Sequence, residues 1–270
     1  MAVPFKEFLW RLRFRGWDLA NRWLYVQRRQ AFRPKGSLVI PSESLEGLYP
    51  EGTLAEQEAE RLRQAYGLDW PDERINMQEN LHVVGLLERA LAEHSAELPA
   101  ELSVLDVGAK DWHYLPGLQR FLGRVGATEV RSLQLTGIEL DPYYRYDDGY
   151  TRYDYAQAYM RECPACRYLV GDVRTHEGTY DLALVLFPFW REREVLDWGL
   201  PGGYFDIDGL LRHVRGLVKP GSLLVVSAFR SEGPWAEPTF RRLGWTALDQ
   251  GEWRSPFVKA SPILWWVFRA

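Results

Sequence analysis

The sequence of 270 residues has few cysteines and no long apolar run. Its two cysteines, Cys163 and Cys166, are too few for a disulfide framework and suit a reducing compartment. No apolar stretch approaches the roughly 18 residues of a membrane span, and the N-terminus lacks the continuous apolar core of a signal peptide. We therefore expect neither a disulfide-rich secreted domain nor a transmembrane segment, and we expect a cytoplasmic protein.

The cysteine pair also lacks the partners of a metal site. The spacing Cys-Pro-Ala-Cys occurs in zinc knuckles, but no second pair of this kind supplies the other two ligands. The pair precedes a predicted strand instead of opening a helix, which disfavours redox catalysis. We expect a loop with two ordinary thiols and no metal.

Charge is unevenly distributed along the chain. Residues 1–35 carry nine Lys or Arg against Glu7 and Asp18, a net charge of +7. Because the whole chain has a net charge of −4, residues 36–270 carry about −11. A basic arm predicts contact with an anionic partner such as RNA or a membrane surface. The alternative is that the arm folds back on its own acidic body and uses its aromatic side chains for packing.

Residues 1–95 read as an extension: the basic aromatic arm, a linker and two helices. Thr53 and Glu56 form a capping box, and Gly67 is a typical helix stop. A second helix is predicted after Pro71, with an apolar stripe from Met77 towards residue 95. Residues 96–270 then form the predicted main domain.

From about residue 101, short apolar strands alternate with helical segments. The predicted strands are "LSVLDVGA", "SLQLTGIEL", "RYLVGDV", "DLALVLF" and "SLLVVSAF". Continuous apolar strands separated by helices predict a parallel sheet covered on both faces. The last two strands, "GWTALDQGEWRS" and "ILWWVF", are joined too closely for a crossover and predict an antiparallel hairpin. The expected fold class is α/β, with seven mostly parallel strands and an antiparallel C-terminal strand.

Three successive strands each end in an acidic residue: Asp106, Glu139 and Asp172. Ligands of open α/β sheets bind beyond the carboxyl ends of the strands, so these carboxylates are predicted to share one site. They suit a ligand with several donors, such as ribose hydroxyls, an amine or an ammonium group. A dinucleotide site is disfavoured, because the glycines of G-x-G-x-x-G are absent after Gly108.

These segments resemble the motifs of the class I S-adenosylmethionine-dependent methyltransferases. "VLDVGAKDW" is similar to their first motif, "LTGIELD" to the second, "YLVGDV" to the third and "YDLALVLFPF" to the fourth. "LLRHVRGLVKPGSLLVV" resembles the fifth, and the likeness spans about residues 80–270. The resemblance implies a Rossmann-like fold, S-adenosylmethionine as the cofactor and methyl transfer as the activity.

The resemblance also implies roles for the residues at the strand ends. Asp106 and Gly108 would border the methionine part of the cofactor, and Glu139 would hold its ribose hydroxyls. Asp172 and Val173 would meet the adenine.

The loop after the first strand departs from the family pattern. The family has glycine at the positions of Lys110 and Trp112, where the backbone approaches the cofactor closely. Either Lys110 turns outward or reaches the methionine carboxylate while Trp112 opens the helix, or the pocket is blocked. The second alternative predicts a methyltransferase-like binding or scaffold module that transfers no methyl group.

Aromatic and proline residues near the strand ends are the candidates for acceptor binding: Tyr143, Tyr144, Phe187, Pro188 and Trp190. In the family, Leu186 together with Phe187 and Pro188 would line the passage between cofactor and acceptor. "LFPF" lacks the Asn-Pro-Pro-aromatic signature of enzymes that methylate base or amide nitrogens, which disfavours a nucleobase acceptor. The aromatic walls favour a small-molecule or lipid-like acceptor, and the basic arm leaves RNA open.

A general base is needed only if the acceptor must lose a proton. The candidates for this role are Asp111, His113 and Asp141. We expect His113 to lie in a helix.

Overall fold

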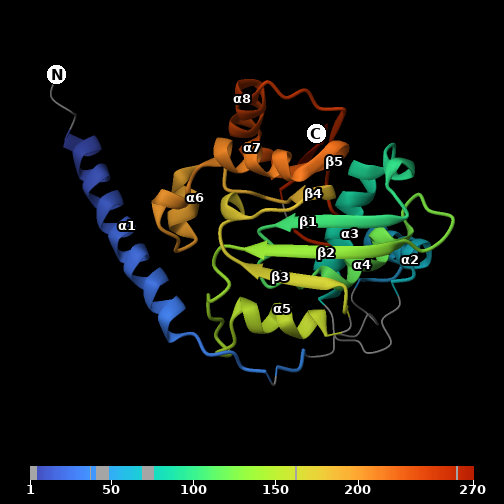
Figure 1. Ribbon diagram of the computed structural model, residues 1–270, viewed down its shortest axis with the longest axis horizontal. Helices are drawn as coiled ribbons and strands as arrows, with labels where there is room; N and C mark the ends of the chain where they lie inside the picture. The colour runs from blue at the N-terminus through green and yellow to red at the C-terminus, as the bar shows by residue number, and fades with distance from the viewer. Residues whose placement is uncertain (1–4, 37, 41–48, 69–75, 162, 260) are drawn as a thin grey trace.

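The fold is built around one seven-stranded sheet with the strand order β3-β2-β1-β4-β5-β7-β6 (Figure 1). The computed structural model describes residues 5–36, 38–40, 49–68, 76–161, 163–259 and 261–270, with side chains from residue 14 onward. Neighbouring strands are parallel from β3 to β5, whereas β7 runs antiparallel to both β5 and β6. The predicted sheet and its reversed last strand are confirmed.

The strands are the apolar segments that the sequence indicates. Their bounds are β1 Glu101–Val107, β2 Ser132–Glu139, β3 Cys166–Val170, β4 Tyr180–Val185, β5 Val218–Phe229, β6 Asp249–Trp253 and β7 Ile263–Arg269. The central strands β1 and β4 are buried along most of their length, because helices cover both faces of the sheet.

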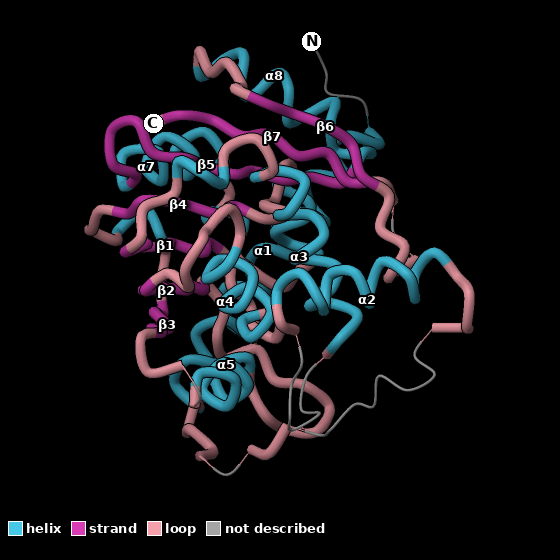
Figure 2. Tube along the Cα trace, turned by 90° about the vertical axis from the view of Figure 1, so that its right-hand side faces the viewer, coloured by secondary structure: helices cyan, strands magenta, loops and turns pink. Residues whose placement is uncertain are grey.

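Helices cover each face over its own hydrophobic cluster. One face is covered by α3 (Met77–Leu91), α4 (Leu115–Arg124) and α5 (Arg152–Met160), with α2 (Leu54–Tyr66) outside them. The other is covered by α7 (Ile207–Leu217) and α8 (Gly233–Leu243). Figure 2 shows the strands stacked edge to edge with α3 and α4 along one side. Each face therefore has a separate core.

The first of the two predicted helices of the extension begins and ends where the sequence predicts, whereas the second ends at Leu91, short of the expected residue 95. The predicted capping box forms only in part, because the Glu56 carboxylate accepts from the Gly52 N–H and not from the Thr53 N–H. Thr53 caps α2 by accepting a hydrogen bond from the Glu56 N–H at 3.3 Å, and Gly67 ends it with a left-handed φ of 61°. Pro71 lies outside the described residues. The next helix, α3, begins at Met77 after the cap Asn76, and its apolar stripe lies in the same cluster as α4.

The long first helix, α1 (Phe5–Ala31), lies beyond the ends of β1, β2 and β3, next to the short helix α6 (Glu192–Asp197) (Figure 1). Its Tyr25 packs with Val195 and Leu200 in a third, small cluster. The alternative in which the arm folds back on the body is thus realised by the second half of α1. No described helix combines the length and apolarity needed to cross a bilayer.

The cysteine pair differs from the sequence expectation. Cys163 and Cys166 are joined in a disulfide with Cα atoms 5.4 Å apart, so the prediction of two ordinary thiols was wrong. A turn places them together: the N–H of Cys166, the first residue of β3, donates to the Cys163 carbonyl at 3.0 Å. Among the described residues, no group of three or more candidate ligands could hold a metal ion.

Candidate functional site

The loop between β1 and α4 has a backbone that normally requires glycine. Gly108 has φ 76°, Lys110 φ 56° and Trp112 φ 52°, all in the left-handed region. A non-glycine residue in this region is strained by about 1–2 kcal/mol. Lys110 and Trp112 stand where the methyltransferase motif has glycine. The loop therefore has a backbone conformation that favours glycine, although these two residues are not glycine.

The indole of Trp112 explains how one of these residues is held. It is fully buried, and its Nε1 donates to Asp106 Oδ2 at 2.8 Å. Gly137 on β2 leaves room for the ring, since a Cβ at that position would come within 2.9 Å of the indole. Trp112 lies ahead of α4, which begins at Leu115. It does not open the helix as one alternative supposed.

Asp106 at the end of β1 is buried and only partly satisfied. Tyr114 donates to the same Oδ2 at 2.8 Å, whereas Oδ1 has no partner among the described residues. Burial raises the pKa of Asp106 to about 6 although the bonds from Tyr114 and Trp112 act in the opposite direction. The partnerless oxygen could accept a hydrogen bond from a ligand or a water.

Glu139, the predicted ribose ligand, is held by backbone groups. Its Oε2 accepts from the Lys110 N–H at 2.9 Å and its Oε1 from the Asp141 N–H at 2.7 Å. Arg152 lies 3.6 Å from Oε1. The residue is 6% exposed, and burial raises the pKa of its carboxyl. Each oxygen has a second lone pair, so Glu139 can still accept hydroxyl donors that reach it.

Asp141, two residues further on, joins α1 to the sheet. Its Oδ2 lies 3.0 Å from an Arg28 nitrogen and 3.9 Å from Arg152. It is 1% exposed, and burial raises the pKa of its carboxyl against the pull of both guanidiniums. Two buried carboxylates thus face two arginines at the carboxyl end of β2. Neither arginine was predicted from the sequence, in which the excess positive charge of residues 1–35 is the only signal for Arg28.

Asp172, at the end of β3, is paired with Arg174. The Arg174 Nε lies 3.0 Å from both carboxylate oxygens, and the Arg174 N–H donates to Oδ1 at 3.0 Å. Burial opposes ionisation, but these bonds hold the pKa of Asp172 below its usual value. Val173 is buried in the cluster beneath α7. Gly171 has open space around it, as Gly108 has: a Cβ at either position would meet no atom within 4 Å.

The candidate bases Asp111 and His113 form an ion pair within the loop between β1 and α4. His113 Nδ1 lies 2.5 Å from Asp111 Oδ1, and Tyr146 donates to Asp111 Oδ2 at 2.7 Å. Burial works against charge on the ring, but Asp111 and Glu79 outweigh it and raise the pKa of His113 to about 9. His113 lies in the turn before α4, so its expected helical position was wrong. A protonated imidazole is a donor and has no free nitrogen to accept a proton.

The residues after β4 separate to the two faces of the sheet. Phe187 has φ 54°, its N–H donates to Ser227 Oγ at 3.2 Å, and its ring stacks on Phe229 at 4.8 Å. Leu186 and Phe187 pack on the cluster beneath α3, and Pro188 is half-buried. Trp190 belongs to the opposite cluster, 5.6 Å from Phe240. Phe187 and Trp190 therefore do not share one wall.

The two candidate tyrosines face α1. From α1, the Arg29 guanidinium lies over the Tyr143 ring at 5.7 Å and the Arg28 guanidinium over the Tyr144 ring at 5.9 Å. Tyr143 also packs on Phe32 with ring centroids 4.2 Å apart, and the Arg152 guanidinium lies 4.6 Å from the Tyr144 ring centroid. They cover the Arg28 and Arg152 region next to Glu139, on the same edge as the predicted cofactor contacts.

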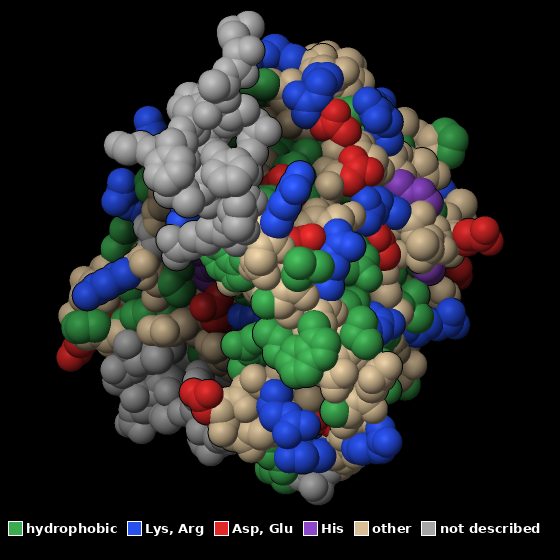
Figure 3. Space-filling view, turned by 90° about the vertical axis from the view of Figure 1, so that its left-hand side faces the viewer, with side chains coloured by type: hydrophobic (Ala, Val, Ile, Leu, Met, Phe, Trp, Pro, Cys, Tyr) green, Lys and Arg blue, Asp and Glu red, His purple; other side chains and the backbone are tan. Residues whose placement is uncertain are grey.

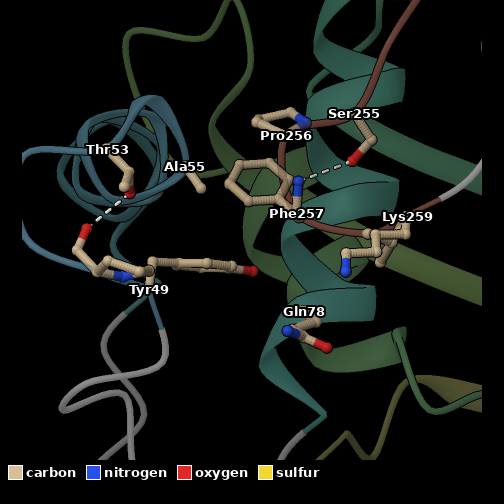
Figure 4. Close-up of a pocket in the computed structure, with 10 residues that line it drawn as sticks. Tyr49, Thr53, Ala55, Gln78, Ser255, Pro256, Phe257 and Lys259 are labelled. Carbon is tan, nitrogen blue, oxygen red and sulfur yellow. Dashed lines mark hydrogen bonds between the residues drawn. The ribbon is translucent and has the colours of Figure 1, made fainter.

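A separate hollow of about 630 Å³ lies between the start of α2, the start of α3 and the segment before β7 (Figure 4). The rings of Tyr49 and Phe257 face each other across it, with their centroids 5.8 Å apart. Burial raises the pKa of the Tyr49 hydroxyl to about 12. None of the residues predicted from the sequence to form the site lines this hollow.

No sequence model of a known family matches the chain, and no curated protein matches it. Solved structures do. A Listeria monocytogenes protein assigned to the class I S-adenosylmethionine-dependent methyltransferases superposes with TM-score 0.50 at 10% identity, covering 81% of this chain and 69% of the other. The N-methyltransferase NodS of Bradyrhizobium japonicum gives 0.48 at 15% identity, with 72% and 97% covered. TrmN of Thermus thermophilus gives 0.47 at 17% identity, with 70% and 48% covered.

At these identities the likeness shows the fold alone. The chain has the Rossmann-like α/β fold of the class I methyltransferases, as the sequence motifs predict. Because one fold hosts many activities, the chemistry must be argued from the site.

Proposed function

We propose that the chain binds S-adenosylmethionine at the carboxyl edge of the sheet and transfers its methyl group to an acceptor. The observation that carries this proposal is the left-handed backbone at Gly108, Lys110 and Trp112. Strain of this kind persists where surrounding contacts maintain it, and it is concentrated at functional sites. Here it keeps the conformation in which a glycine-rich loop approaches a cofactor.

The residues at this edge fit such a cofactor. The space over Gly108 and Gly171 is open, and the buried oxygens Asp106 Oδ1 and Asp141 Oδ1 lack partners among the described residues. Glu139 would accept the ribose hydroxyls through its remaining lone pairs. Asp106 and the loop of Lys110 would border the methionine part, and Asp172 with Val173 the adenine.

When bound, the cofactor supplies an activated methyl group on a sulfonium. A methyl group activated in this way would need only an acceptor aligned with its carbon–sulfur bond. The role of the chain is then to hold the acceptor in line. The raised pKa of His113 keeps its ring charged at neutral pH, and Asp111 is ion-paired to it. Asp141 is ion-paired to Arg28, so none of the three candidates suits a general base. This favours an acceptor that needs no base. Because "LFPF" lacks the Asn-Pro-Pro-aromatic signature of enzymes that methylate base nitrogens, we propose a small-molecule or lipid-like acceptor and not a nucleobase.

A second candidate function is a binding module without transfer. It is favoured by Glu139, whose two oxygens already accept backbone N–H groups, and by the bulk of Trp112. In this alternative Arg28 and Arg152 are the permanent partners of the Asp141 and Glu139 carboxylates, in place of a ligand.

Calorimetric titration with S-adenosylmethionine and with S-adenosylhomocysteine tests the proposal. We expect a Kd on the order of micromolar for both, about −8 kcal/mol. Glu139→Gln should weaken binding at least about tenfold, because it removes the charge that attracts two hydroxyl donors. Asp181→Asn is the matched control: Asp181 is a carboxylate at the start of β4 that bonds Ser103 and Lys219.

Absence of binding at millimolar ligand, in a sample shown to be folded, would make the binding module the leading function. Equal affinities in Glu139→Gln and Asp181→Asn would place the ligand elsewhere. Formation of S-adenosylhomocysteine in the presence of candidate acceptors would exclude the module without transfer.

A further inference from the structure

The inner side of α1 is fixed to the body by polar contacts at helical spacing. Asn21 Nδ2 donates to the carbonyls of Leu196 and Leu200, both at 3.0 Å. One turn later the Tyr25 hydroxyl donates to the Leu140 carbonyl at 2.9 Å, and Arg28 then reaches Asp141. These contacts set the rotation of the helix about its axis, and so determine which residues face away from the body.

The side of α1 that faces away from the body is unusually apolar. Leu19 is 66% exposed and Trp23 63%. The described residues include twelve exposed large hydrophobic side chains, and five of them fall within ten consecutive positions of this helix: Trp17, Leu19, Trp23, Leu24 and Val26. At 100° per residue, Leu19, Trp23 and Val26 lie on the side opposite Asn21 and Tyr25. They form what we call the outer face. Trp17 and Leu24 instead flank the inner side.

A row of arginines borders the outer face. Arg15, Arg22 and Arg29 are exposed and recur every seven residues, so they lie along one edge between the inner side and the outer face. Asp18 is the one acidic residue among positions 14–35, and it pairs with Arg22 at 2.9 Å. Figure 3, which looks onto this end of the molecule, shows hydrophobic and Lys/Arg side chains side by side.

We propose that the outer face of α1 docks on an anionic lipid bilayer, with the helix lying parallel to the surface. A long helix with an aromatic and aliphatic face and bordering arginines fits the headgroup boundary of a membrane. The helix spans 27 residues, or about 40 Å, and lies at the outside of the molecule, so a flat surface can reach it (Figure 1). It lies on the bilayer and does not cross it.

Two other occupants fit less well. RNA would use the arginines and tryptophans, but Leu19 and Val26 on the outer face offer no stacking surface for bases. A second copy of the chain would cover the apolar side chains but would bring two rows of arginines together, which repel each other. The bilayer satisfies the apolar and the basic residues at once, and this inference does not depend on the proposed function.

The test is co-sedimentation of the full chain with vesicles of phosphatidylcholine alone and of phosphatidylcholine with about 30% phosphatidylserine. We expect binding to the mixed vesicles, weakened by salt. The double variant Leu19→Ser with Trp23→Ser should lose at least about tenfold in affinity. Arg22→Gln should lose about fivefold on anionic vesicles only. Trp235→Ser, which removes an exposed tryptophan from α8, should bind like the wild type.

Three results would overturn the proposal. The first is equal sedimentation of wild type and the double variant, both shown by circular dichroism to be folded. The second is binding of single-stranded RNA, but not of vesicles, that the double variant loses. The third is a wild-type dimer in light scattering that the double variant converts to monomer while neither binds vesicles.

Discussion

Glycine substitution at Lys110 and at Trp112 should have opposite effects on stability, although both residues have the same sign of φ. At Lys110 a glycine relieves about 1–2 kcal/mol of left-handed strain and costs about 0.5–1 kcal/mol of backbone entropy. The Lys110 side chain is half-buried, and its charge helps to lower the pKa of Asp111 and of Glu79, an effect that is lost equally in Lys110→Gly and Lys110→Ala. Lys110→Gly should therefore raise the free energy of unfolding by about 0.5–1 kcal/mol.

At Trp112 the same relief is outweighed by the loss of the side chain. Emptying a fully buried tryptophan site costs about 3–5 kcal/mol, and Asp106 loses its bond from the indole as well. Trp112→Gly should lower the free energy of unfolding by about 2–4 kcal/mol.

Urea denaturation followed by far-UV circular dichroism measures both changes. Lys110→Ala is the control, since it removes the side chain but keeps the Cβ that causes the strain. If Lys110→Ala is as stable as Lys110→Gly, the backbone explanation is wrong. If Trp112→Gly unfolds at the wild-type urea concentration, the indole does not support the loop.

Three further outcomes follow from the contacts of the described residues. Arg28→Ala should release α1, seen as faster proteolytic cleavage within residues 14–31, because it leaves a buried carboxylate with one partner fewer. Arg22→Ala, which removes only an exposed pair, should be cleaved at the wild-type rate. The folded pKa of His113 of about 9 lies above the 6.5 of the unfolded chain, so its stabilisation is complete below pH 6.5 and lost as pH rises through 9. Between pH 6.5 and pH 9.5 the free energy of unfolding of the wild type, measured by urea denaturation, should fall by an amount on the order of 3 kcal/mol. His113→Gln should abolish this fall, and a variant that loses as much stability as the wild type over this pH range would contradict the assignment. Thiol titration should find no free cysteine before reduction, and Cys163→Ser should cost at most about 2 kcal/mol, because the closed loop is short.

The fold could be read from the sequence because its signals are local. Strands buried on both faces leave continuous apolar runs, and a short connection between the last two strands permits only an antiparallel pair. The acidic ends of β1, β2 and β3 followed from the same pattern, since the residue after a buried strand marks its carboxyl end.

The partners of those acidic residues could not be read in this way. Arg28 reaches Asp141 across 113 positions of sequence, through a helix whose docking depends on single hydrogen bonds to carbonyl groups. The sequence likewise shows the missing glycines but not the bond from Trp112 to Asp106. His113 was misplaced because α4 begins only at Leu115, without a side-chain cap to mark its start.

The rotation of α1 links its two sides thermodynamically. Arg28 on the inner side holds Asp141, two residues from Glu139, while Trp23 on the outer face meets the solvent. If binding of α1 to a surface changes the affinity of a ligand for the end of β2 by some factor, thermodynamic linkage requires that this ligand change the affinity of α1 for the surface by the same factor. A surface that leaves Arg28 in place gives a factor of one. A surface that rotates the helix by the angle of even one residue moves Arg28 away from Asp141. The rotation of α1 about its axis therefore determines whether binding on its outer face is coupled to binding at the end of β2.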